Sequence, residues 1–185
     1  LPTAGLPPQL TGWNDFESFM GTLIAARTIS SIREVWWDVR PHPDFGTVEL
    51  RMCDGMATLS EVASVAALAQ TLVHDLEARL DAGEELPGAR DWVIRENKWL
   101  AARFGLEAEL IVDNEGSLRP ARELVDELVT RLEPTARQLG CADELEGVLT
   151  ILDEGPSYLR QRRLVEAGGD LRAVAAQRVD DMADT

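Results

Sequence analysis

Charged and apolar side chains alternate along two neighbouring runs, EVWWDVR at residues 34–40 and GTVELRM at residues 46–52. Successive side chains of a β-strand point to opposite faces. Glu49 and Arg51 therefore share one face of the second run. The other face is apolar and is expected to lie on a core; it consists of Val48, Leu50 and Met52.

The first run alternates in the same way, with Trp36, Asp38 and Arg40 opposite Val35, Trp37 and Val39. The two runs are rich in β-branched and aromatic residues and are separated by PHPDF, whose prolines favour a loop because they cannot donate ladder hydrogen bonds. We therefore expect an antiparallel hairpin. If its polar faces coincide, it presents four charged side chains together, Asp38, Arg40, Glu49 and Arg51.

Such a set suits the chemistry of nucleotides. A carboxylate is a hard oxygen ligand for Mg²⁺, which takes few protein ligands beside phosphates and water. Arginine offers a planar fork of donors to phosphate or carboxylate oxygens, and charge-assisted hydrogen bonds of this kind contribute about 1.5–3 kcal/mol each. Phosphoryl transfer depends mainly on such positioning and charge neutralisation.

A simpler interpretation is a solvated strand face. Alternating charges on a strand usually form surface ion pairs, which contribute about 0–1 kcal/mol and imply no function. Spacing alone favours this interpretation over a ligand site, so both stay open at this point.

The hairpin sequence WWDVRPHPDFGTVELRMCD, residues 36–54, resembles the signature strand pair of the glutamate–cysteine ligase type 2 family of carboxylate–amine ligases. Residues 1–8, LPTAGLPP, resemble the family's connector into its second half. Residues 95–111 resemble its downstream helix and strand, and the tail with YLRQRR at residues 158–163 is also similar. The resemblance covers nearly the whole chain and implies a glutamine synthetase-like fold, in which a curved antiparallel sheet lines the active site.

The resemblance also implies roles for individual residues. Glu49 falls on the position of a metal ligand beside the ATP phosphates, and Arg51 on a contact to the transferring phosphoryl group or the substrate carboxylate. Arg40 matches an arginine aimed at nucleotide phosphates. His42 and Asp44 lie in the loop between the strands and are within reach of a ligand, although a loop histidine is more often merely exposed.

Asn97 and Arg103 match two further positions of the family pattern and are binding candidates. They lie six positions apart on one predicted helix, so their side chains point about 120° apart and do not readily reach one ligand. The alternative is a helix surface with an arginine favoured near the C-terminal end of the helix dipole.

Arg160, Arg162 and Arg163 form the densest basic run. Closure over an anionic ligand is one interpretation of this run. Pairing on the helix surface with Glu166 or Asp170 is the favoured one.

The predicted fold class is α+β, with an antiparallel sheet packed against a mostly helical body. The sheet contains the hairpin and a short strand near residues 109–113. Asn14 or Asp15 is expected to cap the first helix, Thr58 and Glu61 to form a capping box, and Pro134 to break a helix. Helices are predicted over residues 14–29, 59–82, 90–103, 120–132, 134–139, 142–153, 157–167 and 170–182.

The helix predicted over residues 59–82 carries an apolar stripe that is expected to face the core. The stripe consists of Leu59, Val62, Val65, Ala66, Ala69, Leu72, Val73, Leu76 and Leu80.

Residues 1–185 are expected to form a single domain that is the C-terminal portion of a larger catalytic domain. It would comprise a connector at 1–13, a hairpin platform with helices at 14–115 and a helical tail at 116–185. The chain opens on Leu1 and its first methionine is Met20, so further residues are expected upstream.

The formal charge is −15, from 33 acidic and 18 basic residues. Such a surface repels phosphate backbones and anionic lipids, so neither nucleic acid nor membrane is an expected partner. Cys53 and Cys141 lack CxxC spacing, which argues against a disulfide scaffold or zinc site and favours the reducing cytoplasm. No signal peptide is expected, since residues near Leu1 lack a basic segment followed by an apolar one, and no apolar run approaches about 18–20 residues.

The reaction that the resemblance implies uses ATP and Mg²⁺ to join the γ-carboxylate of glutamate to an amine such as that of cysteine, through an acyl phosphate. The remaining metal-binding carboxylates of such enzymes come from an N-terminal half that this sequence lacks. We therefore expect the chain to be inactive without that half, in cis or as a second chain, and its open sheet edges to favour homo-oligomers. The alternative function is a non-catalytic helical interaction module that keeps the hairpin as a scaffold.

Overall fold

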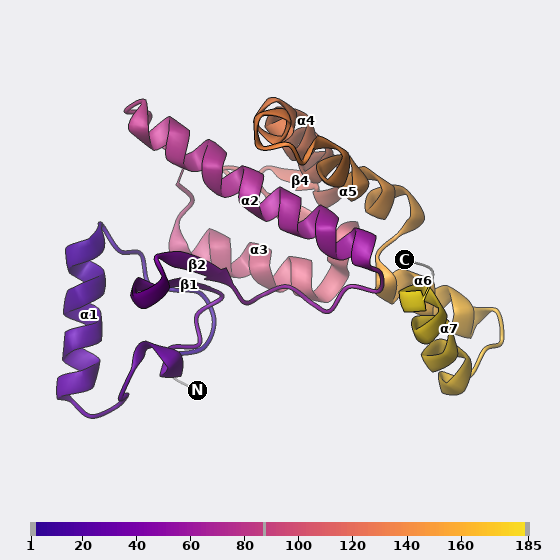
Figure 1. The fold of residues 1–185 in the computed structure, drawn as a ribbon, viewed down its shortest axis with the longest axis horizontal. Coiled ribbons are helices and arrows are strands. Elements are labelled where there is room, and N and C mark those ends of the chain that lie inside the picture. Colours follow the sequence, from indigo (N-terminus) through magenta and orange to yellow (C-terminus); the bar gives the residue numbers. More distant parts are fainter. Residues whose placement is uncertain (1–2, 87, 184–185) are drawn as a thin grey trace. The chain divides into compact units, whose positions relative to one another are not determined.

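The computed structural model describes residues 3–86 and 88–183. It divides into two compact units, Leu1–Gly55 and Met56–Thr185, and each is described by itself. The chain is α+β, as predicted, with helices and two small antiparallel sheets (Figure 1). The expected single domain with its connector, platform and tail stays a prediction. Among the described residues, every helix is too short or too polar to cross a membrane.

The first unit consists of one helix and one hairpin. Helix α1 covers Trp13–Ala25, strand β1 covers Val39–His42 and strand β2 covers Thr47–Leu50. Single 3₁₀ turns lie at Ile32–Glu34 and Pro43–Phe45. The core of the unit forms between α1 and the segment that precedes β1, and it consists of Phe16, Met20, Ile29, Val35 and Trp37.

The first helix differs from its prediction at both ends. Gly12 precedes it without a side-chain cap, and neither Asn14 nor Asp15 is its N-cap. Asp15 instead accepts hydrogen bonds from the Thr11 backbone N–H at 2.9 Å and the Thr11 hydroxyl, and the hydroxyl bond lowers the pKa of Asp15. The helix ends at Ala25 rather than near residue 29, because Arg27 has a left-handed backbone with φ 57°.

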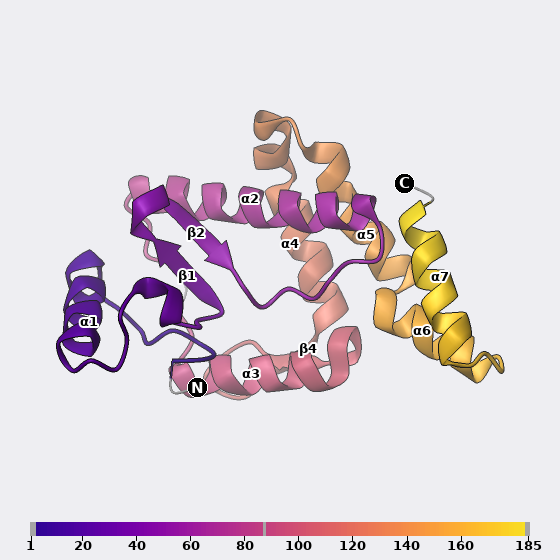
Figure 2. The ribbon, with the colours of Figure 1, turned by 60° about the horizontal axis from the view of Figure 1, so that its bottom comes forward.

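The hairpin is shorter than the predicted pair 34–40 and 46–52. Strands β1 and β2 run side by side (Figure 2). Pro41 and His42 belong to β1 rather than to the loop, and Pro41 pairs with Val48. Both strands of a two-stranded sheet are edges, and an edge tolerates the missing proline N–H. The turn closes at Gly46, whose φ of 59° is a left-handed conformation that glycine adopts at little cost.

The apolar face of β2 does not lie on a core within the described residues. Val48 is 53% exposed and Met52 is 52% exposed. Leu50, at 36%, is the third member of this face. The expectation of burial is wrong for this chain because α1 packs against the segment before β1, where Val35 and Trp37 are buried as predicted.

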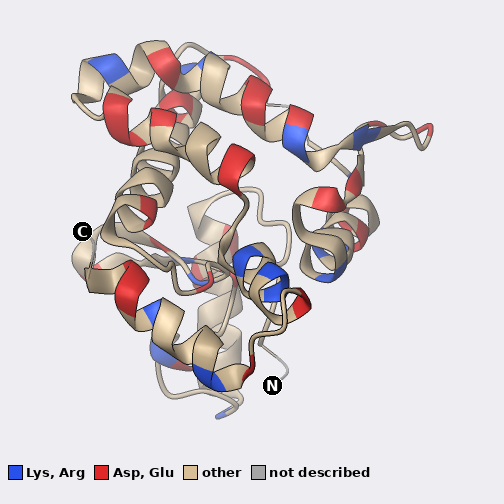
Figure 3. Cartoon of the chain, turned by 90° about the vertical axis from the view of Figure 1, so that its right-hand side faces the viewer, with Lys and Arg blue, Asp and Glu red and all other residues tan. Residues whose placement is uncertain are grey.

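The second unit is mostly helical. Its helices are α2 Leu59–Asp81, α3 Asp91–Phe104, α4 Ala121–Leu139, α5 Ala142–Glu154, α6 Ser157–Glu166 and α7 Leu171–Ala183. Most of these agree with the predicted helices to within about two residues, the usual scatter of helix ends. The capping box of Thr58 and Glu61 at the start of α2 is confirmed. Acidic residues recur along the helices with basic ones among them (Figure 3).

Helices α2, α4 and α5 enclose the core of this unit, which contains Ala67, Val129, Leu132, Ala136, Leu145 and Val148. The predicted apolar stripe of α2 is confirmed at Leu72, which packs against this core, and is wrong at Leu59 and Leu80, which are 65% and 58% exposed. The buried residues of α2 are Glu61 and three smaller ones, Ser64, Ala67 and Thr71. A Cβ atom placed on Gly147 of α5 would lie 2.2 Å from the Ser64 hydroxyl oxygen, so the two helices approach closely through small side chains.

Helix α4 does not break at Pro134 but continues to Leu139. Leu132 and Ala136 lie on either side of the proline and are both fully buried. Packing of these neighbours in the core offsets the hydrogen bond that the proline removes.

The predicted strand near residues 109–113 does not join the hairpin. Strand β3, Glu109–Ile111, pairs with β4, Leu118–Pro120, as a separate two-stranded sheet. Pro120 therefore ends a strand and precedes α4 instead of occupying its first turn. Asp113 shapes the connecting turn by accepting backbone hydrogen bonds from Glu115 at 3.0 Å and from Ser117 at 2.9 Å.

This turn gives a pH-dependent stability. Hydrogen bonds from Ser117 lower the pKa of Asp113 in the folded state. Ionised Asp113 therefore adds to the free energy of unfolding in full above its unfolded pKa of about 3.9. This stabilisation is lost as the pH falls through the lower pKa of the folded state. We expect the thermal midpoint of the parent to exceed that of Asp113→Asn at neutral pH, with the gap closing on acidification. Glu115→Gln is the control at an exposed position of the same turn. A gap that persists unchanged at about pH 2 would contradict the role of Asp113.

Candidate functional site

Glu49 lies between two arginines on one face of the hairpin. The strand register places Arg40 directly opposite Glu49. Arg40 donates from Nε to Glu49 Oε2 at 3.0 Å, and its Nη2 forms an ion pair with the same oxygen. Arg51 donates from Nη1 to the other oxygen, Oε1, at 2.6 Å. The predicted shared face of four charged residues is therefore confirmed for Arg40, Glu49 and Arg51, and the place of the Asp38 side chain in it stays a prediction.

Arg40 is the buried member of this set, and its side chain is only 8% exposed. Its Nη1 donates to the backbone carbonyls of Ile32 at 3.3 Å and Val35 at 3.0 Å. The guanidinium thus joins the turn before β1 to the Glu49 carboxylate. In this conformation Arg40 faces inward, and its donors are directed at protein acceptors.

Arg51 is the more open cation, with a side chain that is 28% exposed. Its guanidinium carbon lies 5.1 Å from the centre of the Trp36 ring, a cation–π distance. Its backbone N–H donates to the Asp38 carbonyl at 2.7 Å. Trp36 is 48% exposed, and its ring supports the guanidinium of Arg51. Arg51 is therefore placed to meet an anionic group from outside the hairpin.

Glu49 is held in its ionised form. The hydrogen bond from Arg40 is the main cause that lowers its pKa, and Arg51 adds to the effect. A carboxylate offers about four lone-pair positions, of which the two arginines occupy three. One position on Oε1 remains open in this conformation, and a metal contact of Glu49 stays a prediction. No group of three or more His, Cys, Asp or Glu side chains suited to a metal ion occurs among the described residues.

His42 and Asp44 differ in exposure. His42 is only 8% exposed and its ring stacks on Phe45 at 4.4 Å between ring centres. The expectation of an exposed loop histidine is wrong, because His42 belongs to β1. Its Nδ1 has no hydrogen-bond partner among the described residues. Asp44 lies exposed in the turn, as expected.

Asn97 and Arg103 both lie on α3, in the second unit. Asn97 donates from Nδ2 to the Ile111 carbonyl and accepts from the Ile111 N–H, both at 2.8 Å. Its amide thus satisfies backbone groups of β3 as a neighbouring strand would. Arg103 is exposed, with its guanidinium carbon 5.4 Å from the Phe104 ring centre. Contacts of either residue with a ligand stay predictions.

The double hydrogen bond of Asn97 implies a measurable effect on stability. We expect Asn97→Ala to lower the free energy of unfolding by about 1–3 kcal/mol, because it leaves the N–H and C=O of Ile111 without their partner. Asn114→Ala, at an exposed turn position, is the matched control and should change little. Denaturant unfolding measures both, and equal stability of the two variants would contradict this role of Asn97.

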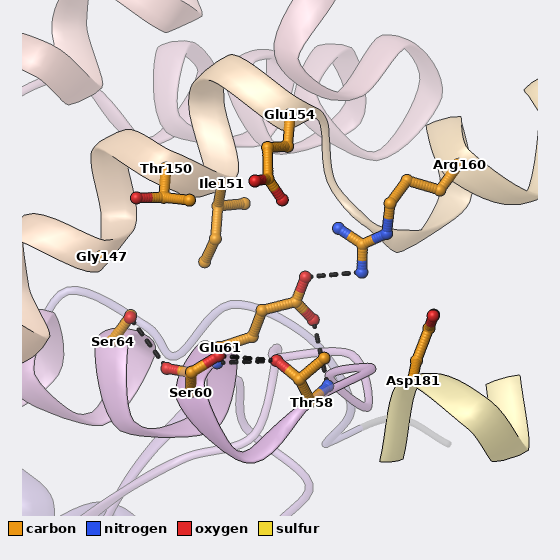
Figure 4. Close-up of a pocket in the computed structure, with 10 residues that line it drawn as sticks. All are labelled: Thr58, Ser60, Glu61, Ser64, Gly147, Thr150, Ile151, Glu154, Arg160 and Asp181. Atoms are coloured by element: carbon orange, nitrogen blue, oxygen red, sulfur yellow. Dashed lines mark hydrogen bonds and ion pairs between the residues drawn. The ribbon is translucent and has the colours of Figure 1, made fainter. Parts of the chain in front are cut away.

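The basic run does not pair with Glu166 or Asp170 in the described residues, so that preference is wrong. Arg160 forms an ion pair with Glu61, 99 residues away in the sequence, at 2.6 Å (Figure 4). Arg163 donates to the Glu154 carbonyl at 2.7 Å. Arg162 lies over the Tyr158 ring at 5.4 Å. Spacing within the tail gives no signal for a partner so distant.

A family model described as Glutamate-cysteine ligase family 2 (GCS2) matches residues 1–177. The chain belongs to this family. Over 183 residues it is 55% identical to a Frankia casuarinae protein named "Putative glutamate--cysteine ligase 2-1", covering 98% of this chain and 48% of that protein. Over 174 residues it is 52% identical to a Thermobifida fusca protein named "Putative glutamate--cysteine ligase 2", covering 94% of this chain and 44% of that protein.

Membership in glutamate–cysteine ligase family 2 changes the weight of the two interpretations of the hairpin. The ligand-site interpretation now has support besides strand alternation, because the chain belongs to a family described as glutamate-cysteine ligase family 2. The chain spans about half the length of the curated relatives that it matches. The activity of the whole protein therefore belongs to the proposal that follows.

Proposed function

We propose that the whole protein is an ATP-dependent carboxylate–amine ligase. It would join the γ-carboxylate of glutamate to the amine of an amino acid such as cysteine, through an acyl phosphate, with release of ADP and phosphate. The observation that carries the proposal is the arrangement of Glu49 between inward-facing Arg40 and open Arg51. Membership in glutamate–cysteine ligase family 2 supports it.

Each member of the set has a separate role in this proposal. Arg51 binds an anionic oxygen, either of the transferring phosphoryl group or of the substrate carboxylate, since a guanidinium matches both. Arg40 orients Glu49; to contact a nucleotide phosphate itself it would have to leave its present acceptors. Glu49 supplies one oxygen to Mg²⁺, an ion that proteins often hold by one or two carboxylates. The bound ion would neutralise charge on the ATP phosphates.

The remaining half of the protein completes the site in this proposal. It supplies the other metal-binding carboxylates, in cis or as a second chain, and forms with this chain a glutamine synthetase-like fold. An exposed apolar row supports contact of the other half with the hairpin; it consists of Val48, Leu50 and Met52. Burial of these side chains under the other half would lower the free energy of the whole protein.

An assay of ADP release tests this division of the site. The whole protein with ATP and Mg²⁺ is expected to release ADP at a rate that rises with the concentration of glutamate and with that of cysteine. Residues 1–185 alone are expected to release none above background, and addition of the remaining half to restore release. Full turnover by this chain alone would contradict the division.

A non-catalytic interaction module is the second candidate. Trp92 and Trp99 lie seven positions apart on α3 and are each 55% exposed, which is typical of residues that anchor protein interfaces. A whole protein that binds neither ATP nor glutamate, but loses a binding partner in Trp92→Ala, would favour this candidate over the ligase.

A further inference from the structure

The last two helices, α6 and α7, are attached to their unit mainly by polar contacts. None of their described residues is buried, whereas α2, α4 and α5 share a core that includes the fully buried Leu132. Helices α6 and α7 lie against each other (Figure 2). Ser157 joins them by accepting a hydrogen bond from Arg178 at 2.6 Å. The pair is therefore suited to move as one body.

A two-residue connection, Gly155–Pro156, joins α5 to this pair. Gly155 has φ 90°, a conformation that other residues adopt only with strain. Pro156 stands directly before α6 and contributes no backbone N–H. Rotation about the Gly155 backbone would swing α6 and α7 without breaking any helix.

Arg160 spans this connection and ties it to α2. Its Nη1 donates to the Gly155 carbonyl at 2.8 Å, and its Nη2 donates to Glu61 Oε1 at 2.6 Å. Glu61 is 8% exposed, and its other oxygen accepts from the Ala57 N–H at 2.8 Å. Loss of Arg160 would leave a largely buried carboxylate without its counter-charge, which is strongly unfavourable.

A polar hollow of about 360 Å³ lies where α2, α5 and this helix pair meet (Figure 4). Glu61, Glu154 and Asp181 line it, and Arg160 is the one cation among the described residues of its wall. Without Arg160 the carboxylates would repel one another across the hollow. The ion pair of Arg160 and Glu61 is thus the main electrostatic attraction that holds this wall in place.

We propose that α6 and α7 form a strap that swings about Gly155–Pro156, is closed by Arg160 on Glu61, and uncovers the polar hollow when it opens. Two weaker tethers accompany the ion pair: Arg163 donates to the Glu154 carbonyl, and the Leu106 N–H donates to the Tyr158 hydroxyl at 3.2 Å. This motion does not depend on the ligase activity proposed above.

Amide hydrogen exchange of the whole protein tests the strap. In Arg160→Met, exchange in α6, α7 and the first turn of α2 is expected to become about tenfold faster or more, with no change in the core amides of α4. Arg160→Lys keeps the positive charge but loses the guanidinium that reaches both Gly155 and Glu61. Its exchange rates should lie between those of the parent and of Arg160→Met. Arg172→Met is the matched control, since Arg172 is exposed on α7, takes no part in the bridge to Glu61 and should leave exchange as in the parent.

The proposal is overturned if α6 and α7 exchange at the parental rate in Arg160→Met. It is equally overturned if exchange rises to the same extent in α4, because that result indicates general destabilisation.

Discussion

Replacing Glu49 by Gln is expected to lower glutamate-dependent ADP release by the whole protein about 100-fold or more. Removal of one preorganised charged group from a catalytic site commonly has an effect of this size. The amide side chain keeps the shape and one acceptor oxygen, so Arg40 retains a hydrogen bond, but the negative charge that orients both arginines and offers an oxygen to Mg²⁺ is gone. The measurement is the initial rate of ADP release at saturating glutamate and ATP.

Two controls separate this result from misfolding. Glu109→Gln removes an exposed carboxylate from β3 and should keep the parental rate. The circular-dichroism spectrum of Glu49→Gln should match that of the parent if the protein keeps its fold. Undiminished turnover in Glu49→Gln would remove Glu49 from the catalytic machinery and, with it, the ligase proposal for this hairpin.

Truncation of Leu132 to Ala is expected to have the largest effect on stability, a loss of about 2–5 kcal/mol in the free energy of unfolding. Leu132 is fully buried where α4 meets α2 and α5, so truncation removes its packing contacts and leaves a cavity. Denaturant unfolding followed by circular dichroism measures the loss.

Leu171→Ala is the matched control for this prediction. The same truncation is made on α7 at a side chain that is 83% exposed, and it should change the free energy by no more than about 0.5 kcal/mol. A similar small change in Leu132→Ala would mean that the core of this unit lies elsewhere than between α2, α4 and α5.

Local sequence patterns predicted the parts of this structure that local interactions decide. The capping box of Thr58 and Glu61 needs only four consecutive residues, and α3 starts and ends within one residue of its predicted range 90–103. The shared face of Glu49 and Arg51 follows from the two-residue period of a strand. Family resemblance added the ligase assignment that spacing alone could not supply.

Other features required contacts between distant residues. The close approach of α2 and α5 depends on Gly147 of α5, which admits Ser64 of α2, while Leu59 and Leu80 near the ends of α2 remain exposed. The core neighbours of Pro134 likewise outweigh its preference to end a helix. No local pattern contains these partners.

The sequence by itself determined where most helices run and which charged side chains of the hairpin stand together, because backbone periodicity fixes both. Only the tertiary structure decided that the Arg40 side chain is buried while that of Arg51 is partly exposed. It also decided that Arg160 pairs with Glu61, 99 residues away in the sequence. Burial and long-range pairing arise from how elements pack, and packing sums contacts that no short segment of the chain holds.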